Sequence, residues 1–198
     1  MRVEVQAWQH IYTSVEREQS PHDRGGFQTL FYSHSGLSEC EVKEMETRLI
    51  YFPSQVDATK RLCATTSTGN VMVAQIVHLA EPDRLGRTGR YLAHNLVFEP
   101  QAFERISANP FLIFAQFPFI TTIVDALNSG DPETGEIPPA ALQLHIPPVS
   151  VAGRDAAQAW QPLELKKLAL LALRADHLAH DRLSIAVIGP PADVEAAL

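Results

Sequence analysis

The sequence predicts a mixed α+β fold with a largely antiparallel sheet and packed helices. Segments rich in β-branched and aromatic residues recur along the first half of the chain and are joined by turn residues, which is typical of paired strands. A capped amphipathic segment lies between two such pairs, and the last part of the chain has the pattern of a helix–strand–helix unit. With 198 residues, the chain is long enough to bury a hydrophobic core.

The composition narrows the classes of function. Hydrophobic residues make up 45% of the chain and charged residues 20%, as in ordinary globular proteins. The formal net charge of -7 disfavours a nucleic-acid-binding protein, which usually presents a basic face. There are only two cysteines, and no apolar run has the length of a signal peptide or a membrane span. We therefore expect a cytoplasmic protein with neither nucleic acid nor membrane as its partner.

The N-terminal part predicts two strands and a helix. Residues 3–14 and 26–33 have the composition of strands that could pair as a hairpin with a long polar connection. Ser38 and Glu41 form the S-x-x-E pattern of a capping box, in which each side chain bonds to a backbone N–H of the other residue. A helix over 39–50 follows, whose buried stripe consists of Val42, Met45, Leu49 and Ile50.

The middle of the chain predicts a second hairpin and a central strand. Strands over 61–67 and 71–79 flank Thr68-Gly69-Asn70, which tolerates the positive φ of tight turns. A basic turn leads into a strand over 90–98. Short helices are predicted over 101–107, opened by Pro100, and over 119–128. The aromatic cluster of Phe111, Phe114, Phe117 and Phe119 is expected to lie in the core.

Composition also suggests where the domains end. Residues 1–128 are predicted to form the main α+β domain, and the Pro/Gly-rich stretch 129–154 a linker or long loop. Residues 155–198 are predicted to form a helix–strand–helix unit that could begin a following domain. Because its last helix ends without a capping residue, we expect the chain to be part of a longer protein.

The segment from Asp83 to Phe98 holds the densest set of candidate site residues. Its loop carries Arg87 and Arg90 beside glycines, and guanidinium groups with exposed backbone N–H groups suit an anion such as phosphate or a carboxylate. On the strand that follows, alternation places His94 on the same face as Arg90 and Tyr91 on the opposite face. The alternative is a structural turn whose arginines pair with nearby carboxylates.

Histidines suggest two further sites. If the first strand lies beside the strand over 90–98, His10 could approach His94, and such a pair could act in acid–base chemistry; the alternative is a buried, hydrogen-bonded histidine. His177 and His180 have a spacing that could share a metal ion, but they lie at the end of a predicted helix, where histidine also favours the helix dipole. We expect neither a metal site nor a cofactor.

Several segments together resemble a known family. They are HIYTS at 10–14, GGF at 25–27, GLSECEV at 36–42, DRLGRTGRYLAHNLVF at 83–98 and AVIGPP at 186–191. The chain thereby resembles the N-terminal domain of bacterial GTPase-associated proteins, which are large multidomain proteins encoded beside GTPases in gene neighbourhoods of the conflict or defence type. It departs from the family pattern at Arg90, where that family often has Asn.

The resemblance implies a non-enzymatic interaction or adaptor module with a GTPase or another protein as its partner. It supplies no catalytic residues. The alternative hypothesis is a domain that binds or hydrolyses a small anionic ligand with Arg87, Arg90 and His94, together with Tyr91 and His10. These two readings differ in what they require of the side chains, because only the second requires them to converge on an accessible site.

Overall fold

The computed structural model describes residues 1–146, apart from Pro21, 51–58, 83–85 and 87. Residues Met1–Ile146 form one compact unit. The predicted helix–strand–helix unit at 155–198 and the last part of the predicted linker lie outside the described residues.

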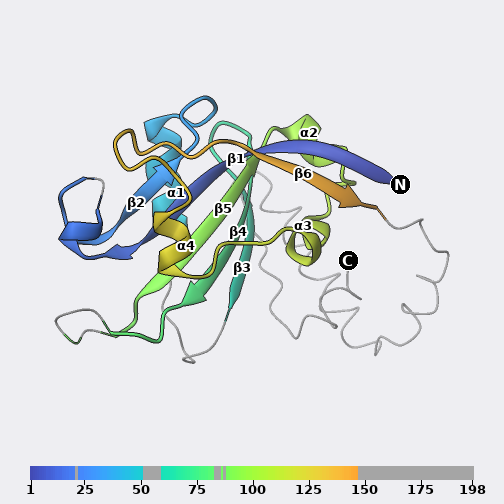
Figure 1. Ribbon diagram of the computed structural model, residues 1–198. Helices are drawn as coiled ribbons and strands as arrows, with labels where there is room; N and C mark the ends of the chain where they lie inside the picture. The colour runs from blue at the N-terminus through green and yellow to red at the C-terminus, as the bar shows by residue number, and fades with distance from the viewer. Residues whose placement is uncertain (21, 51–58, 83–85, 87, 147–198) are drawn as a thin grey trace, which may run out of the picture. The chain divides into compact units, whose positions relative to one another are not determined.

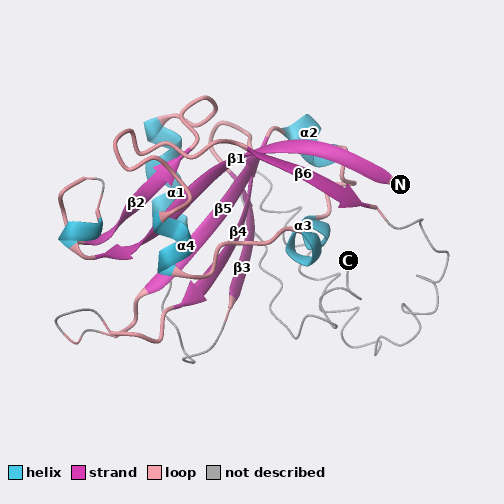
Figure 2. Cartoon of the chain, in the orientation of Figure 1, coloured by secondary structure: helices cyan, strands magenta, loops and turns pink. Residues whose placement is uncertain are grey.

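A six-stranded antiparallel sheet forms the centre of this unit, in the strand order β2-β1-β5-β4-β3, with β6 also paired to β1. Helices accompany it, so the predicted mixed α+β fold is confirmed (Figures 1 and 2). The strands are β1 (Arg2–Val15), β2 (Gly26–Tyr32), β3 (Lys60–Thr65), β4 (Val71–His78), β5 (Tyr91–Phe98) and β6 (Ala140–His145).

The helices in the described part of the chain are short. They are α1 (Glu39–Arg48), α2 (Pro100–Glu104), α3 (Pro110–Gln116) and α4 (Ile123–Leu127), with a 3-10 turn η1 (Arg17–Gln19) between β1 and β2. Among the residues described, no helix is both long and apolar enough to cross a membrane.

Strand β1 organises the sheet because three other strands pair with it. Its first half pairs with β6, from Arg2 opposite His145 to Ala7 opposite Ala140. Its second half pairs with β2 and with β5, where Ile11 lies opposite His94. The predicted hairpin of the first two strands is therefore confirmed, and the first strand does lie beside the strand over 90–98.

The two faces of β5 are covered by different helices. Leu92, Leu96 and Phe98 pack with residues of α2, α3, α4 and β6, and α3 and α4 lie in front of the sheet in Figure 1. On the opposite face, Ala93 and Val97 belong to the clusters that contain α1 and its C-cap. Because both faces are covered, every residue of β5 is buried.

Helix α1 begins as predicted and ends earlier. The Ser38 hydroxyl accepts a hydrogen bond from the Glu41 backbone N–H at 3.3 Å, which confirms the N-cap. The helix ends at Arg48, so Ile50 lies beyond the buried stripe and is 51% exposed, in contrast to the prediction. The predicted return bond from the Glu41 carboxylate to Ser38 is also replaced, since that carboxylate binds the β3–β4 turn.

Two elements were not predicted. Helix α3 begins at Pro110, and the Asn109 side chain caps it by accepting from the Phe111 N–H at 3.0 Å. Strand β6 lies within the segment 129–154 that was predicted as a linker or long loop. It belongs to the sheet because Leu142 and Leu144 alternate inward and are buried in the core.

Candidate functional site

A chain of buried hydrogen bonds joins β5, β1, β2 and α1, and contains the predicted site residue His10. The Asn95 side chain contacts His10 Nδ1 at 2.7 Å, and His10 Nε2 contacts Thr29 Oγ1 at 2.7 Å. Thr29 Oγ1 donates to Glu46 Oε1 at 2.7 Å. His10 and Asn95 have no exposed surface, so most of this chain of hydrogen bonds is sealed from water.

The proton positions in this chain follow from its last bond. The Thr29 hydroxyl has a single proton, which it gives to the Glu46 carboxylate, so it must accept the proton on His10 Nε2. His10 Nδ1 is then free to accept from the Asn95 amide. This arrangement needs a neutral imidazole, and burial, together with the nearby His94 ring, lowers the pKa of His10 to about 3.

Three aromatic rings lie beside this chain on the same face of the sheet. The Phe27 and Tyr91 rings are 4.5 Å apart between centroids, and the Tyr12 ring is 6.1 Å from Phe27 and 6.4 Å from His10. Burial, followed by the charge of Glu46, raises the pKa of Tyr12, which therefore stays protonated. Phe27 is 45% exposed and Tyr91 5%, so the cluster reaches the surface mainly through Phe27.

His94 lies in a second chain of hydrogen bonds. The Ile120 backbone N–H donates to His94 Nδ1 at 2.9 Å, so Nε2 carries the proton and donates to Gln9 Oε1 at 2.9 Å. The Gln9 amide donates in turn to the Pro138 carbonyl at 2.7 Å. His94 is 1% exposed and burial lowers its pKa to about 3. Both ring nitrogens are thus engaged in holding the chain around residues 120 and 138 against the sheet.

The two predicted histidines do not meet on one face. His10 lies opposite Asn95 in the β1–β5 register, whereas His94 lies opposite Ile11. Residues that are opposite each other in a strand pair project to the same side, and neighbours along a strand project to opposite sides. The rings therefore belong to different faces, although their strands are adjacent as expected.

The remaining predicted residues belong to the loop before β5. Arg87 lies outside the described residues. Gly86 and Gly89 have φ values of +75° and +86°, the left-handed conformation that the Gly-rich turn predicts. Arg90 donates to the Ser14 carbonyl at 2.6 Å, which ties this loop to the end of β1. Within the described part of the chain its buried Nε has no hydrogen-bond partner.

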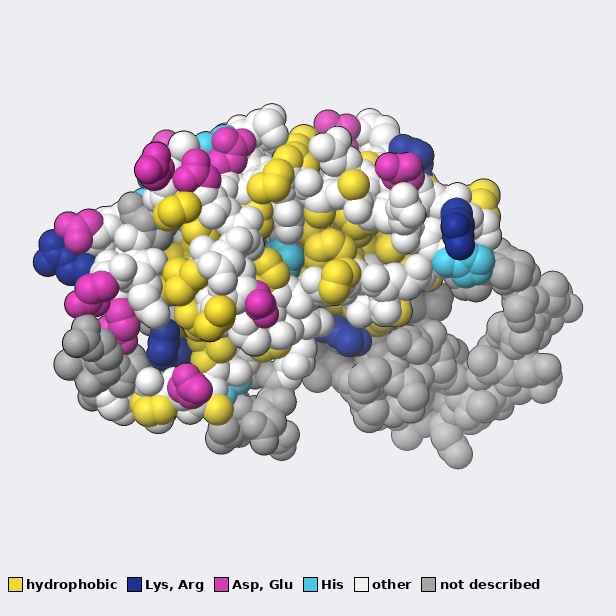
Figure 3. Space-filling view, viewed as in Figure 1, with side chains coloured by type: hydrophobic (Ala, Val, Ile, Leu, Met, Phe, Trp, Pro, Cys, Tyr) yellow, Lys and Arg dark blue, Asp and Glu magenta, His cyan; other side chains and the backbone are white. Residues whose placement is uncertain are grey.

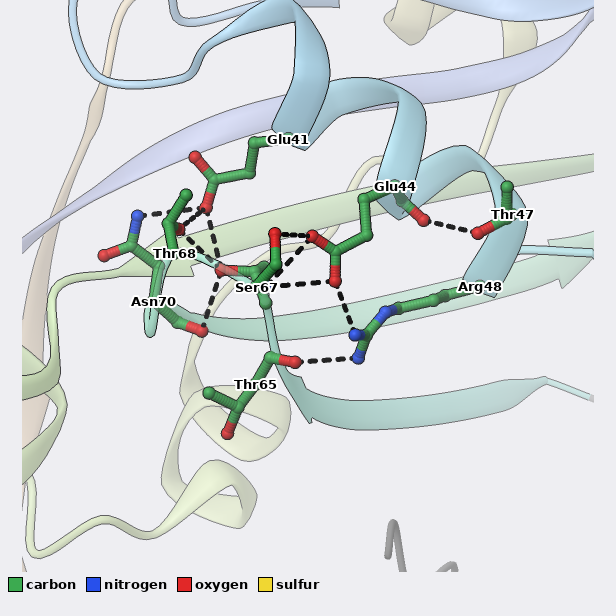
Figure 4. Close-up of polar contacts among 9 residues, drawn as sticks. Glu41, Glu44, Thr47, Arg48, Thr65, Ser67, Thr68 and Asn70 are labelled. Atoms are coloured by element: carbon green, nitrogen blue, oxygen red, sulfur yellow. Dashed lines mark hydrogen bonds and ion pairs between the residues drawn. The ribbon is translucent and has the colours of Figure 1, made fainter. Parts of the chain in front are cut away.

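A further polar cluster joins α1 to the turn between β3 and β4 (Figure 4). The Glu41 carboxylate is 3% exposed, and its Oε1 accepts from Thr66 Oγ1 at 2.9 Å, Thr68 Oγ1 at 2.6 Å and Asn70 Nδ2 at 3.0 Å. Three donors on one oxygen replace the water that a buried carboxylate would lose. Glu41 therefore fixes the turn against the helix.

One helical turn further on, Glu44 continues this contact. Its carboxylate accepts from the backbone N–H of Ser67 at 2.9 Å and forms an ion pair with Arg48 (Figure 4). Although burial opposes it, these bonds from Ser67 and Arg48 lower the pKa of Glu44. The Glu44 carboxylate thus remains charged and bonded at neutral pH.

The comparisons with known proteins give one match. Residues 6–139 match the family described as GTPase-associated protein 1, N-terminal domain type 2. The chain belongs to this family. No curated protein and no solved structure matches the chain. The resemblance that the sequence motifs indicated is thereby confirmed, and the family name associates this type 2 N-terminal domain with GTPases.

Two of the family motifs have clear positions in the type 2 domain, whereas AVIGPP at 186–191 lies outside both the described residues and the matched range. Gly36 opens the GLSECEV segment, and a Cβ atom there would lie 1.8 Å from Trp8 Cε2, so only glycine fits without rearrangement. The next residues of that segment are the helix cap Ser38 and the buried Glu41. In HIYTS at 10–14, His10 contributes the buried ring described above. These motifs therefore hold the fold together.

No motif in the sequence indicates that Thr29, Asn95 and Glu46 belong to a chain of hydrogen bonds. The alternation in β5 placed Asn95 on the face opposite His94, but nothing in the sequence gave its register with His10. Thr29 beside His10 has the spacing of a hydroxyl and its base, yet the Thr29 proton is directed to Glu46. Among the described residues, no group of three or more acidic, His or Cys side chains could hold a metal ion.

Apolar side chains gather on the surface over α3, α4 and the adjoining strands (Figure 3). Val124 of α4 is 67% exposed. Several others are only partly buried against the core, namely Val71, Val77, Leu79, Phe114, Phe117, Ile120 and Leu127. Apolar side chains therefore make up much of this surface, although the chain as a whole has a net charge of -7.

Proposed function

We propose that this domain is a non-enzymatic interaction or adaptor module of a larger GTPase-associated protein, acting in a cytoplasmic conflict-type system. The observation that carries the proposal is family membership over residues 6–139. The placement of the polar side chains supports it, since His10 and His94 have their ring nitrogens bonded within the domain and a pKa of about 3. At neutral pH both rings are therefore uncharged, and neither has a free nitrogen with which to exchange a proton with a substrate.

Binding to a GTPase tests the proposal. The domain and the GTPase encoded beside it are purified, and complex formation is measured by isothermal titration calorimetry with GDP and with a non-hydrolysable GTP analogue. We expect a saturable complex with at least one nucleotide state, and no binding to an unrelated GTPase of similar size. Absence of a complex with both the domain and the full-length protein would argue against the adaptor role.

A second candidate function is anion binding by the loop before β5. The observation that favours it is Arg90, whose buried Nε has no hydrogen-bond partner among the described residues, while its Nη2 donates to the Ser14 carbonyl. We propose that Arg87 and Arg90 bind a phosphate or carboxylate there. Titration with inorganic phosphate, followed through the NMR signal of the Arg90 Nε–H, should shift that signal saturably. A signal that does not move at millimolar phosphate would rule this site out.

A further inference from the structure

Strand β3 forms one edge of the sheet. It stands last in the strand order β2-β1-β5-β4-β3 and, among the described strands, pairs only with β4. Its side chains alternate between half-buried and exposed along Lys60–Thr65, and Cys63 is exposed. The edge position of β3 explains why Cys63 is exposed although it lies in a strand.

The register shows which backbone groups of β3 face outward. Arg48 Nη1 donates to the Thr65 carbonyl at 2.8 Å, so this carbonyl points away from β4. The next residue, Thr66, donates its N–H to the Asn70 carbonyl at 2.8 Å, toward the other side of the hairpin. Because the direction alternates along an antiparallel strand, the N–H and C=O groups of Arg61 and Cys63 point outward like those of Thr65. They have no hydrogen-bond partner among the described residues.

This edge is basic, although the chain as a whole has a net charge of -7. Lys60 and Arg61 lie at its start, and the guanidinium of Arg61 lies over the Phe114 ring at 5.2 Å from the centroid. Within the described part of the chain, ion pairs join only Arg17 to Asp23 and Arg48 to Glu44. The two basic side chains of β3 thus form no ion pair within the described part of the chain.

We propose that the outer edge of β3 binds an extended, acidic segment of a protein partner, which joins the sheet as a further strand. Backbone hydrogen bonds to Arg61, to Cys63 and to the N–H of Thr65 would supply affinity, and the charges of Lys60 and Arg61 would select acidic sequences. A second copy of this domain fits less well, because it would bring two more basic side chains to the same edge. This inference rests on the proposed function as an interaction module and names the surface and the partner chemistry.

Peptide binding provides the first test. A fluorescent peptide of alternating Glu and Thr is titrated with the full chain, and fluorescence anisotropy is compared with that of a matched peptide of alternating Lys and Thr. We expect saturable binding of the acidic peptide alone. Equal binding of both peptides, or binding of neither, would overturn the proposal.

Two variants locate the binding to the edge. Cys63→Pro removes an outward N–H while leaving the ladder to β4, because proline is tolerated where an edge N–H faces solvent. We expect it to weaken acidic-peptide binding by about ten-fold, equivalent to about 1.4 kcal/mol, with Cys63→Ser as the matched control. Arg61→Glu provides a second variant, which reverses a charge at the edge and also removes the contact with the Phe114 ring, and it should reverse the preference between the two peptides. Unchanged affinity in both variants, with circular dichroism like that of the parent chain, would contradict the proposal.

Hydrogen exchange separates this inference from the proposed function. The amides of Arg61, Cys63 and Thr65 should exchange rapidly in the free protein and slowly with the acidic peptide. Slow exchange already in the free protein would mean that the edge is occupied, and would overturn the inference. If the GTPase binds the parent chain and Cys63→Pro equally well, the adaptor role is supported and β3 is not the binding edge. If the acidic peptide slows exchange at β3 but no GTPase binds, β3 is a peptide-binding edge and the adaptor role toward a GTPase is contradicted.

Discussion

At the scale of single residues, the two buried histidines make the domain sensitive to acid. His10 and His94 have pKa values of about 3 when folded, below the ordinary value of 6.5. Below pH 6.5 the unfolded chain takes up protons at these residues while the folded chain does not. Stability is therefore fully present above pH 6.5 and is lost as the pH falls toward 3.

We expect the free energy of unfolding to fall by roughly 4 kcal/mol between pH 7 and pH 5 if both shifts act fully, because one pKa unit corresponds to about 1.4 kcal/mol. Urea unfolding at a series of pH values measures this. His94→Gln should reduce the slope, because it removes one of the two lowered pKa values. A stability that is flat from pH 7 to pH 5 would show that the histidines are not sealed from water.

Gly36 provides a second residue-scale prediction. Because an added Cβ would lie 1.8 Å from Trp8 Cε2, Gly36→Ala must displace the indole or the chain around it. We expect it to lower stability by about 1 to 3 kcal/mol, the usual cost of overpacking. Gly25→Ala is the matched control, since the nearest atom to its Cβ would be 3.4 Å away. Equal midpoints of urea unfolding for the two variants would contradict this account.

At the scale of elements, the Glu41 carboxylate is the link between α1 and the β3–β4 hairpin. Glu41→Ala would leave the hydroxyls of Thr66 and Thr68 and the Asn70 amide without their acceptor. We expect a loss of about 2 to 3 kcal/mol and faster amide exchange in the turn, because unsatisfied buried donors are costly. The exposed Glu39, two residues earlier on the same helix, serves as the control, and Glu39→Ala should change stability by less than about 0.5 kcal/mol.

The elements also show which parts of the fold the sequence could predict. Strands β1 to β5 and the start of α1 have strong local signals, namely alternation, a Gly-Asn turn and a serine cap, and all were predicted. Strand β6 has the alternating apolar residues Leu142 and Leu144, but the prolines around it favour the prediction of a linker or long loop. Helix α3 was missed because its signal is the short Asn109-Pro110 start followed by aromatic residues that do not form a clear stripe.

The polar chains were less predictable than the elements. His10 and His94 were identified as noteworthy from the sequence, and so was their adjacency in neighbouring strands. Their partners Thr29, Gln9 and Ile120 come from other elements, and only strand register and loop position bring them together. Local sequence determines which face a side chain occupies, whereas a hydrogen-bond partner depends on contacts between distant segments.

At the scale of the whole molecule, β6 brings the last described residues beside the first ones, because it pairs with the start of β1. The N-terminal ammonium donates to the Ile146 carbonyl at 2.8 Å, and Val5 packs in the same cluster as Leu142 and Leu144. A fragment of residues 1–146 should therefore fold by itself. A fragment limited to the matched residues 6–139 lacks these three apolar side chains and should be less stable by at least about 4 kcal/mol, since each buried Leu contributes about 2 to 5.

Circular dichroism and limited proteolysis of the two fragments measure this difference. The 1–146 fragment should unfold in one cooperative transition, and the shorter fragment should be cleaved faster. Similar stabilities would mean that β6 is dispensable. We propose in addition that residues 155–198 form a separate helix–strand–helix unit, which resistance of that segment to proteolysis would support.

The pairing of β1 has a consequence for how the protein is made. β1 leaves the ribosome before the strands that pair with it, since Thr13 pairs with Leu92 and Arg2 with His145, near the end of the described unit. At ordinary rates of translation, roughly ten seconds or more separate the synthesis of Arg2 from that of His145. During this interval the apolar residues Val5, Ile11 and Val15 lack most of their final neighbours. The nascent chain therefore exposes the apolar side chains of β1 early. We expect chaperones that act at the ribosome to bind this segment.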